Sequence, residues 1–334
     1  MIDTIYFERE IEGHSRSQEL FARFPKAQRI PCDHYKEVFN PRGQNFRLQK
    51  KNPSLILSQN KGKLLHEIPS TYGIGGKRNF YFSHLLNCMY DCRYCFLQGM
   101  FSSAHYVLFV NYEDYWDEIC LTTEQSNDSK SWFFSGYDCD SLAMESITGF
   151  AEFFLPKFKV TPEAFLELRT KSVNTSILKD KEPLANVVVA FSFTPQEISE
   201  QLEHGVPSIE SRLKAIHELS KLGWQVGVRI DPVIDCEEFE KRYRRLFKDI
   251  FEQIRPDNLH SVSLGAFRMP IAFFKKMEKL YPEEPLFAGN LTSQDSNTSY
   301  HPAIEKKRIS TCRSLLLEYV SEEKLFHCEL NIPE

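Results

Sequence analysis

Three cysteines placed close together are the residues of this sequence best suited to chemistry. Cys88, Cys92 and Cys95 form a C-x3-C-x2-C run of eight residues. Thiolates are the ligands that zinc and iron–sulfur clusters take in proteins. A structural zinc site or a fully ligated cluster needs four protein ligands, and no fourth cysteine or histidine follows at zinc-finger spacing. Three cysteines on a four-iron cluster would leave one iron open to an outside ligand, as catalysis requires.

Two other interpretations of this run remain open. One is a structural zinc site whose fourth ligand comes from a distant part of the chain, and the other is three unrelated buried thiols. The odd total of nine cysteines argues against a closed set of disulfides. Five of the nine stand singly, and we interpret them as small buried apolar residues: Cys32, Cys120, Cys236, Cys312 and Cys328.

The elements around the cysteine run alternate between strand and helix patterns. The apolar pattern predicts strands over 80–87, 132–135, 166–170, 187–193, 225–230 and 261–264. It predicts helices over 112–121, 142–155, 209–222, 237–254 and 270–280. Such alternation is typical of an α/β fold with parallel strands and right-handed crossovers. A partial (β/α)6 barrel and an open doubly wound sheet both fit, and in either the chemistry lies at the carboxyl ends of the strands.

The two ends of the chain do not follow this alternation. Residues 1–75 carry scattered charge and short apolar runs, which predicts an irregular N-terminal extension packed on the core. We expect the core domain over 76–285 and a C-terminal extension over 286–334. Within that extension, the polar stretch 287–298 is expected to be a loop, followed by a short helix over 305–319.

Composition and charge exclude several classes of protein. With 334 residues, 42% hydrophobic and 26% charged, the chain is ordinary for a globular protein. It has no apolar run of about 18 residues and no secretion signal, so we expect a cytoplasmic protein without a membrane span. The net charge of −5 gives no general support for nucleic-acid binding. The basic run 241–248 follows several glutamates, and we interpret it as a solvated helix face.

The cysteine run, with Tyr94 before its last cysteine and a strand in front of it, resembles that of the radical S-adenosylmethionine (SAM) superfamily. The resemblance implies a partial six-unit barrel and a [4Fe-4S] cluster on Cys88, Cys92 and Cys95. It also implies that the amino and carboxylate groups of SAM chelate the fourth iron. An electron from the cluster would then split SAM and release a 5′-deoxyadenosyl radical that takes hydrogen from a substrate.

Within this superfamily, the stretch from Asn87 to Gln98 is similar to the cluster loop of the spore photoproduct lyase family. Three later stretches fall in the same order: 169–171, 191–193 and 267–270. The similarity extends over roughly 75–285 and implies a radical SAM lyase acting on a pyrimidine lesion or a related nucleic-acid substrate. Damaged DNA and an electron donor such as flavodoxin or ferredoxin are the implied partners. A radical SAM enzyme for another small molecule or a peptide, and a zinc-stabilised binding module without activity, remain alternatives.

The resemblance also implies roles for individual side chains. Lys171 would pair with the SAM carboxylate, Ser192 would donate a hydrogen bond to SAM, and Gly136 would border the same site. Tyr94 would lie near the adenine or take part in a radical relay. These side chains also have structural interpretations without a cofactor. Lys171 could be a surface lysine, and the hydroxyl of Ser192 could bond to a backbone carbonyl.

Arg229 is the fifth residue assigned to the cofactor site, because it ends the fifth predicted strand. Asp231 follows two residues later, so these two side chains could face the cofactor or pair with each other.

The sequence departs from the family pattern at the step that returns hydrogen to the product. Photoproduct lyases use a cysteine at the end of strand two, but Tyr137 stands at that position and Cys139 comes two residues later. Phe96 occupies a position held by tyrosine in that family and has no O–H to donate. We therefore expect Tyr137 or Cys139 to return hydrogen, or the reaction to be a different one.

Overall fold

A curled sheet of eight strands forms the centre of the computed structural model, which describes residues 2–39, 43–125, 130–294 and 296–328. The strand order is β18-β14-β13-β11-β10-β9-β5-β4. Six parallel strands provide the repeated units: β5 (Arg78–Tyr81), β9 (Ser131–Phe134), β10 (Ala164–Thr170), β11 (Val187–Ser192), β13 (Gln225–Val233) and β14 (Leu259–Ala266). At the two edges, β18 (Leu325–His327) adds a parallel strand and β4 (His66–Glu67) an antiparallel one. The predicted α/β partial barrel is confirmed.

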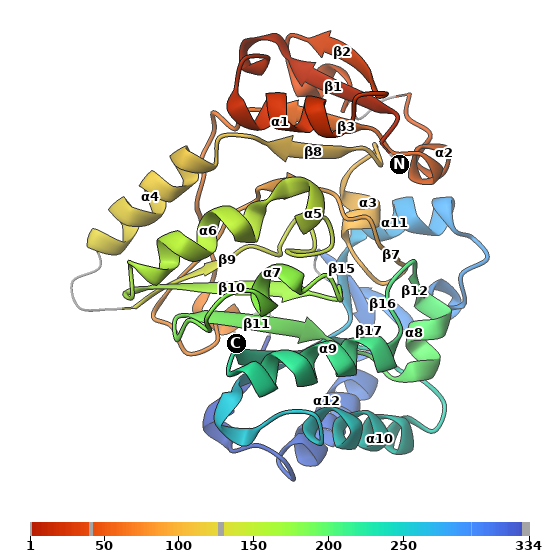
Figure 1. Cartoon of the computed structure of the whole chain (residues 1–334). Coiled ribbons are helices and arrows are strands. Elements are labelled where there is room, and N and C mark those ends of the chain that lie inside the picture. The colour runs from red at the N-terminus through yellow and green to blue at the C-terminus, as the bar shows by residue number, and fades with distance from the viewer. Residues whose placement is uncertain (1, 40–42, 126–129, 295, 329–334) are drawn as a thin grey trace.

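Helices cover the outer face of this sheet, as Figure 1 shows. The helices α4 (Tyr112–Glu124) and α6 (Phe150–Lys159) pack on β10, and α9 (Ile209–Leu222) packs on β13. Farther along the chain, α10 (Phe239–Phe251) packs against α12 (Pro302–Leu316), and α11 (Ile271–Leu280) packs against α3 (Leu97–Met100). The helix α9 has the predicted bounds and ends at Gly223, whose φ of 99° a glycine adopts without strain.

The helix expected over 142–155 is interrupted, so that prediction is corrected. Gly149, with φ 57°, ends a short α5 (Glu145–Thr148) before α6 begins. The carboxylate of Glu145 accepts hydrogen bonds from the backbone N–H groups of Ala151 and Glu152 at 2.9 and 3.0 Å. These N–H groups lie in the first turn of α6 and have no partner within the helix, so Glu145 caps α6 from the preceding turn.

The expectation of an irregular N-terminal segment is wrong. Residues 4–58 form β1 (Thr4–Glu8), α1 (Ser15–Arg23), β2 (Gln28–Cys32), a short α2 (Phe46–Lys51) and β3 (Leu55–Ser58). A second sheet, in the order β2-β1-β3-β8-β6, joins these strands to β8 (Tyr106–Phe109) and β6 (Leu85–Leu86). Figure 1 shows this sheet above the barrel, with β1, β2 and β3 in red and orange and β8 in yellow.

The strand predicted over 80–87 is therefore two strands in two sheets. β5 ends at Tyr81 in the barrel, and β6 pairs antiparallel with β8 in the N-terminal sheet. The chain thus crosses between the sheets just before the first cysteine. A domain boundary at residue 75 stays a prediction. Two strands of the N-terminal sheet, β6 and β8, come from residues after this position.

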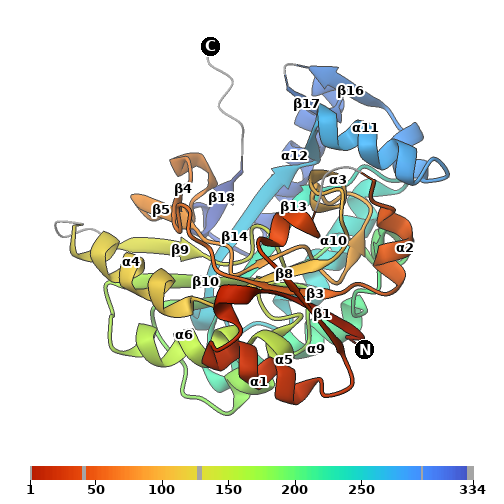
Figure 2. The same cartoon turned by 90° about the horizontal axis from the view of Figure 1, so that it is seen from above.

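The stretch expected to be a loop over 287–298 contains a hairpin instead. β16 (Leu291–Gln294) and β17 (Asn297–Tyr300) pair antiparallel, and β17 also pairs with β15 (Arg268–Pro270). Figure 2 shows this small sheet beside α11, at the edge of the molecule. The last helix begins at Pro302 rather than 305, because His301 caps it by accepting from the N–H of Ala303. Residues 329–334 of the predicted C-terminal extension lie outside the described residues.

No helix in the described ranges is both long enough and apolar enough to cross a bilayer.

His84, just after β5, gives a pH-dependent prediction about stability. Its ring stacks on Phe150 with centroids 3.8 Å apart, and burial lowers its pKa to about 3. Because an unfolded histidine binds a proton near pH 6.5, the fold loses stability as pH falls below that value. We expect the free energy of unfolding to fall by about 1.4 kcal/mol from about pH 7.5 to about pH 5.5 through this residue.

Urea unfolding at the two pH values checks this, with the His84→Phe variant as the reference. The variant keeps an aromatic ring against Phe150 and should lose that share of the pH dependence. Equal pH dependence in the two proteins would contradict the prediction.

Candidate active site

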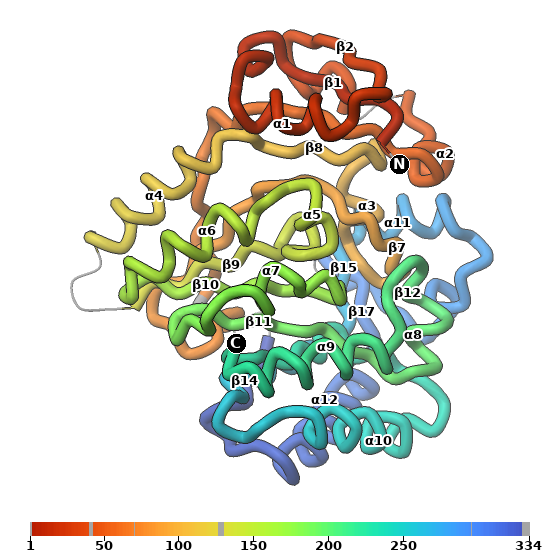
Figure 3. Tube along the Cα trace, in the orientation of Figure 1, coloured from red at the N-terminus to blue at the C-terminus, as the bar shows by residue number. Residues whose placement is uncertain are grey.

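The cysteine run forms a loop at the carboxyl end of β5, where the partial barrel opens. Cys92 ends β7 (Asp91–Cys92), which pairs antiparallel with β12 (Glu203–His204), and Figure 3 shows these two segments side by side. The N–H of Arg93 donates to the carbonyl of Leu202 at 2.8 Å. Two segments distant in the sequence therefore hold the loop in place.

The first turn of the loop is fixed from the N-terminal sheet. Asn87 has φ 71°, and its side-chain amide donates to the carbonyls of Ser103 and His105 at 2.8 and 2.7 Å. The ammonium of Lys50, in α2, donates to the carbonyls of Cys88 and Tyr90 at 2.7 and 3.0 Å. Asparagine is one of the few residues other than glycine that adopts this left-handed conformation readily.

The three thiols lie in an apolar environment that raises their pKa values. Burial raises the pKa of Cys88 to about 12, raises that of Cys92 well above its usual value, and raises that of Cys95 as well. Each of these pKa values is also raised by another cysteine of the three or by a nearby carboxylate, and lowered by Lys50 or Lys171. Three thiolates gathered here would need a positively charged partner, which a metal centre supplies.

The donor set fits a cluster better than a single ion. In the described part of the chain, no three His, Cys, Asp or Glu side chains are arranged to hold one metal ion. The cysteines of a four-iron cluster each bind a different iron, so they need not converge on a single point. The zinc alternative therefore has no single-ion site among the described residues.

Lys171 lies beside this loop, as the sequence predicted. Its ammonium is 5.4 Å from the centre of the Tyr94 ring. Burial lowers the pKa of Lys171, but the charges of Cys92 and Glu203 raise this pKa by more, so the net pKa shift is upward. Asp140 fixes the backbone here by accepting from the N–H of Lys171 and the hydroxyl of Thr170, both at 2.6 Å. This places a stable ammonium within the cysteine site.

A buried network behind Tyr94 was not predicted from the sequence. The phenol of Tyr94 donates to Glu203, whose carboxylate lies 2.5 Å from the guanidinium of Arg212 with both side chains fully buried. Glu203 also accepts from Thr194 and Ser199. Burial raises the pKa of Glu203, but Arg212 and Lys171 outweigh this and hold that pKa below its usual value.

One sequence signal for this network existed. Arg212 shares a helical face with Ile209, Ile216 and Leu219, and a charge on an apolar face requires a buried partner.

Gly136 and Ser192 lie at the carboxyl ends of β9 and β11, on the side of the barrel where the cysteine loop sits. A Cβ at Gly136 would come within 2.8 Å of the Cβ of Arg169 and 3.0 Å of its carbonyl oxygen, so only glycine fits. Ser192 is buried, and its carbonyl accepts from Arg212 at 2.9 Å. Their roles toward a cofactor stay predictions.

Arg229 has a different environment from the one expected. It pairs with Glu167 at 2.8 Å, with both side chains fully buried. Its Nε and both terminal nitrogens donate to Glu167, Val228 and Ser261 in five hydrogen bonds. All the N–H groups of Arg229 are thus used, and none is left for a cofactor. The alternative pairing with Asp231 is also wrong, because Asp231 pairs with Arg268 at 3.6 Å.

The two candidates for hydrogen return differ in their surroundings. Tyr137 is 47% exposed, and its ring centre lies 5.5 Å from that of Phe96, next to the last cysteine. Cys139 is only 5% exposed, and its Sγ lies 3.7 Å from the carbonyl of Ser135 in the packed core. Only Tyr137 combines an accessible side chain with a contact to the cysteine loop.

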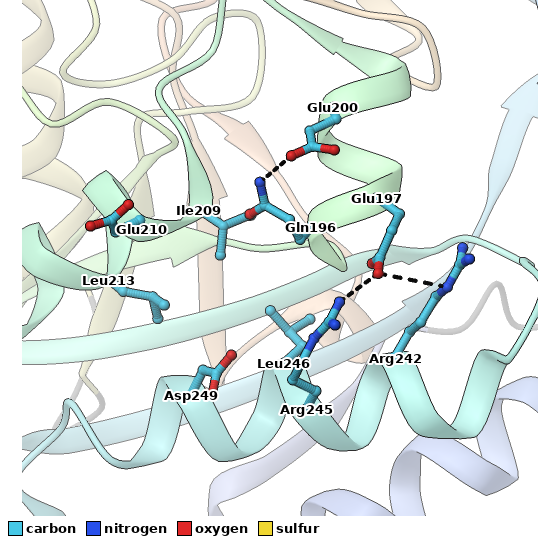
Figure 4. A pocket seen from close by; sticks show the side chains of 10 residues that line it. All are labelled: Gln196, Glu197, Glu200, Ile209, Glu210, Leu213, Arg242, Arg245, Leu246 and Asp249. Atoms are coloured by element: carbon cyan, nitrogen blue, oxygen red, sulfur yellow. Dashed lines mark hydrogen bonds and ion pairs between the residues drawn. The ribbon is translucent and has the colours of Figure 1, made fainter.

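Two surface grooves lie along α10, away from the cysteines. The first, of about 440 Å³, lies between α8 (Gln196–Leu202), α9 and α10. Figure 4 shows Glu197 facing Arg245 and Arg242 across it, at 2.6 and 3.9 Å. The second, of about 660 Å³, runs along the outer side of α10.

The basic run on α10 is neutralised by carboxylates. Arg244 pairs with Glu318 at 2.9 Å, and Lys241 with Glu238 at 2.6 Å. This agrees with a solvated helix face and gives no unpaired basic stripe here for a phosphate backbone.

Comparisons with known proteins place this site in context. Residues 81–290 match the sequence model of the family described as spore photoproduct lyase. The spore photoproduct lyase of Bacillus subtilis (strain 168) is 23% identical over 202 residues, which are 60% of this chain and 59% of that protein. The Clostridium acetobutylicum enzyme is 21% identical over 209 residues, 62% of each chain. The chain thus spans about three fifths of the length of these curated relatives.

Solved structures show the same fold over nearly the whole chain. A spore photoproduct lyase double mutant with bound AdoMet and dinucleoside spore photoproduct superposes with a TM-score of 0.85 at 16% identity, covering 99% of both chains. A spore photoproduct lyase complexed with dinucleoside spore photoproduct gives a TM-score of 0.83 at 17% identity, covering 98% of both chains. The N-terminal sheet and the hairpin therefore belong to the shared fold.

Proposed function

Because this chain belongs to the spore photoproduct lyase family, we propose that it is a radical SAM enzyme that acts on a pyrimidine photolesion or a related nucleic-acid substrate. The observation that carries the proposal is the three-cysteine loop at the open end of the barrel, inside the segment that matches the family. The curated relatives are named for this reaction, and two of the similar solved structures are named for the bound photoproduct.

The proposed cofactors are a [4Fe-4S] cluster and SAM. Cys88, Cys92 and Cys95 would hold the cluster, and the iron without a cysteine would take SAM. When bound, this pair supplies a carbon radical able to remove hydrogen from a substrate. The ammonium of Lys171 would face the SAM carboxylate, with Ser192 as a further polar contact.

Tyr94 and Gly136 are given positioning roles in this proposal. The phenol of Tyr94 is held by Glu203, so its ring forms a fixed wall beside Cys92 rather than a free donor. Gly136, in the loop that follows β9, lets this loop lie close to Arg169 on the strand β10. Both therefore shape the space next to the cluster.

The proposed partners are damaged DNA and a one-electron donor such as flavodoxin or ferredoxin, and the proposed location is the cytoplasm. Because the charges of α10 are paired, we favour the open end of the barrel as the DNA contact. A lesion would have to leave the base stack to reach the cysteine loop.

The direct test is to incubate reduced, reconstituted protein with SAM and UV-irradiated DNA or dinucleotides and to look for restored thymine by mass spectrometry. Restored thymine supports the proposal. SAM cleavage without restored thymine favours the alternative of another small molecule or a peptide. Protein that binds no iron after anaerobic reconstitution contradicts both.

The geometry also favours Tyr137 over Cys139 as the residue that returns hydrogen. In Tyr137→Phe we expect SAM cleavage to continue while the yield of product per SAM falls by at least about tenfold. Cys139→Ala should keep the product yield and lose about 1 kcal/mol of stability, because it leaves a small cavity. Chromatography of 5′-deoxyadenosine and product measures the product yield per SAM in both variants. A yield that falls in Cys139→Ala and is kept in Tyr137→Phe would assign the role to Cys139.

A further inference from the structure

Four aromatic rings form a column from the cysteine loop to the edge of the sheet. The ring of Phe96 lies 5.5 Å from that of Tyr137. Tyr137 stacks on Tyr81 at 4.3 Å with 29° between the planes. Tyr81 in turn stacks on His66 at 4.9 Å and 19°. The column thus connects the loop that carries Cys95 to a half-buried histidine on the edge strand.

Strand order places these rings in line. β4, β5 and β9 are neighbours in the sheet, with His66 opposite Tyr81 and Tyr81 opposite Phe134. Tyr137 follows Phe134 by three residues, in the loop after β9. Side chains directly opposite each other on one face of a sheet lie close together, so the sheet itself supports the stack.

The chemistry of the four rings differs along the column. Only Tyr137 and Tyr81 have an O–H bond that can give up a hydrogen atom. Phe96 has none, so a hydrogen lost from Tyr137 cannot be replaced from the cysteine side of the column. It can be replaced from Tyr81, whose ring is the nearest one to Tyr137 in the column.

Asp138 places a buried carboxylate whose charge acts on both phenols. It is buried, and one of its oxygens accepts from the hydroxyl of Ser83. The other, Oδ1, has no hydrogen-bond partner in the ranges that the structure describes. Burial raises the pKa values of Tyr81 and Tyr137, and the charge of Asp138 raises both further. Both phenols are therefore protonated at neutral pH and lie within reach of the field of this carboxylate.

We propose that Tyr81 is the second residue of a two-tyrosine path that restores the hydrogen of Tyr137 after each turnover. This inference rests on the proposed function and deepens it. In the first step, the O–H bond of Tyr137 breaks homolytically while a C–H bond forms on the product radical, which leaves a tyrosyl radical at Tyr137.

In the second step, Tyr81 gives one electron through the stacked rings and releases its proton to water. The oxygen of Tyr137, whose side chain is exposed, takes a proton from water, so the O–H of Tyr137 is restored and the radical moves to Tyr81. In the third step, a one-electron reductant of the flavodoxin or ferredoxin class and a proton from water restore Tyr81. Each turnover therefore consumes one electron at the tyrosines in addition to the one that splits SAM.

The test compares single and repeated turnovers of Tyr81→Phe, which keeps the ring stack and removes only the O–H. With enzyme in excess over substrate, Tyr137 can complete one turnover, so product should form. In steady state, the rate should fall by about tenfold, and freeze-quenched samples should show a trapped tyrosyl radical that is absent in Tyr81→Phe/Tyr137→Phe. Ring-deuterated tyrosine identifies the signal by narrowing its hyperfine splitting.

Tyr35→Phe is the matched control. Tyr35 also stacks on a histidine, His34, at 4.8 Å and 26°, but lies in a short 3-10 helix (Tyr35–Glu37) that packs beside the N-terminal sheet. It should turn over at the wild-type rate and trap no radical. A slow Tyr35→Phe enzyme would show that loss of a phenol acts through folding and would contradict the specific role of Tyr81.

A measurement without cofactors tests the electron transfer itself. In cofactor-free Tyr81→aminotyrosine protein, a bulky photo-oxidant should oxidise exposed Tyr137 first and position 81 through it. Adding Tyr137→Phe should slow formation of the aminotyrosyl radical severalfold, whereas adding Tyr35→Phe should not. An equal rate in all three proteins would contradict the path.

The proposed function and the role of Tyr81 are contradicted by different results. Wild-type protein that binds iron but leaves SAM intact would contradict the proposed function. A Tyr81→Phe enzyme that matches wild type in steady state and traps no radical would contradict only the second tyrosine.

Discussion

Cys88→Ala, Cys92→Ala and Cys95→Ala should each abolish the formation of 5′-deoxyadenosine from SAM. The proposed cluster is held by three thiols, so the loss of one leaves two irons without protein ligands. The loop itself should stay folded, because backbone bonds to Leu202 and the Lys50 ammonium hold it. Iron content, visible absorbance and chromatography of the SAM products after anaerobic reconstitution measure the effect.

Cys236→Ala is the matched control for these variants. Cys236 is half-buried and borders the same apolar cluster as the three cysteines. It should keep wild-type iron content and SAM cleavage. Wild-type turnover in any one of the three loop variants would refute the cluster assignment.

Glu203→Gln is expected to cost about 3–5 kcal/mol in the free energy of unfolding, because it leaves the Arg212 guanidinium buried without its counter-charge. Both side chains are fully buried, so water cannot solvate the arginine in the folded protein. The double variant Glu203→Leu/Arg212→Met removes both charges and should recover most of that loss. Urea unfolding followed by circular dichroism measures all three proteins.

An exposed ion pair is the control for this second prediction. Lys159 and Glu182 lie 3.0 Å apart with side chains 59% and 84% exposed. Glu182→Gln should therefore change stability by about 1 kcal/mol or less. A double variant as unstable as Glu203→Gln would show that packing, rather than the unpaired charge, explains the loss.

The sequence predicted the parts of the fold whose signals are local. The strand β11 is a continuous apolar run, and α9 has an apolar stripe ended by a glycine. The signals of the N-terminal sheet are shorter, because its strands span two to five residues and pair across long separations, as in β3 with β8. The hairpin of β16 and β17 is built from serine, threonine and asparagine, so no apolar alternation reveals it.

The candidate site divides in the same way. The cysteine run was identified by its spacing and Lys171 by the family resemblance, and their roles toward a cofactor stay predictions. Tyr81 and Glu203 were not, because Tyr81 stacks on His66 of β4 and Glu203 itself lies on β12. These strands have two residues each, and only tertiary contacts create them. Arg229 was assigned wrongly, since its partner Glu167 lies on β10, a different strand.

The shared N-terminal sheet has a consequence for synthesis on the ribosome. β3, with Leu55, Ile56 and Leu57 fully buried in the final fold, gains its second neighbour only from β8, some fifty residues later. Until residues 106–109 leave the exit tunnel, the nascent chain carries an apolar strand with one open side, which other chains can pair with. The cysteine loop lies between these two strands in the sequence. Its three thiols thus emerge before the scaffold that shelters them closes, so we expect insertion of the proposed cluster to follow completion of that scaffold.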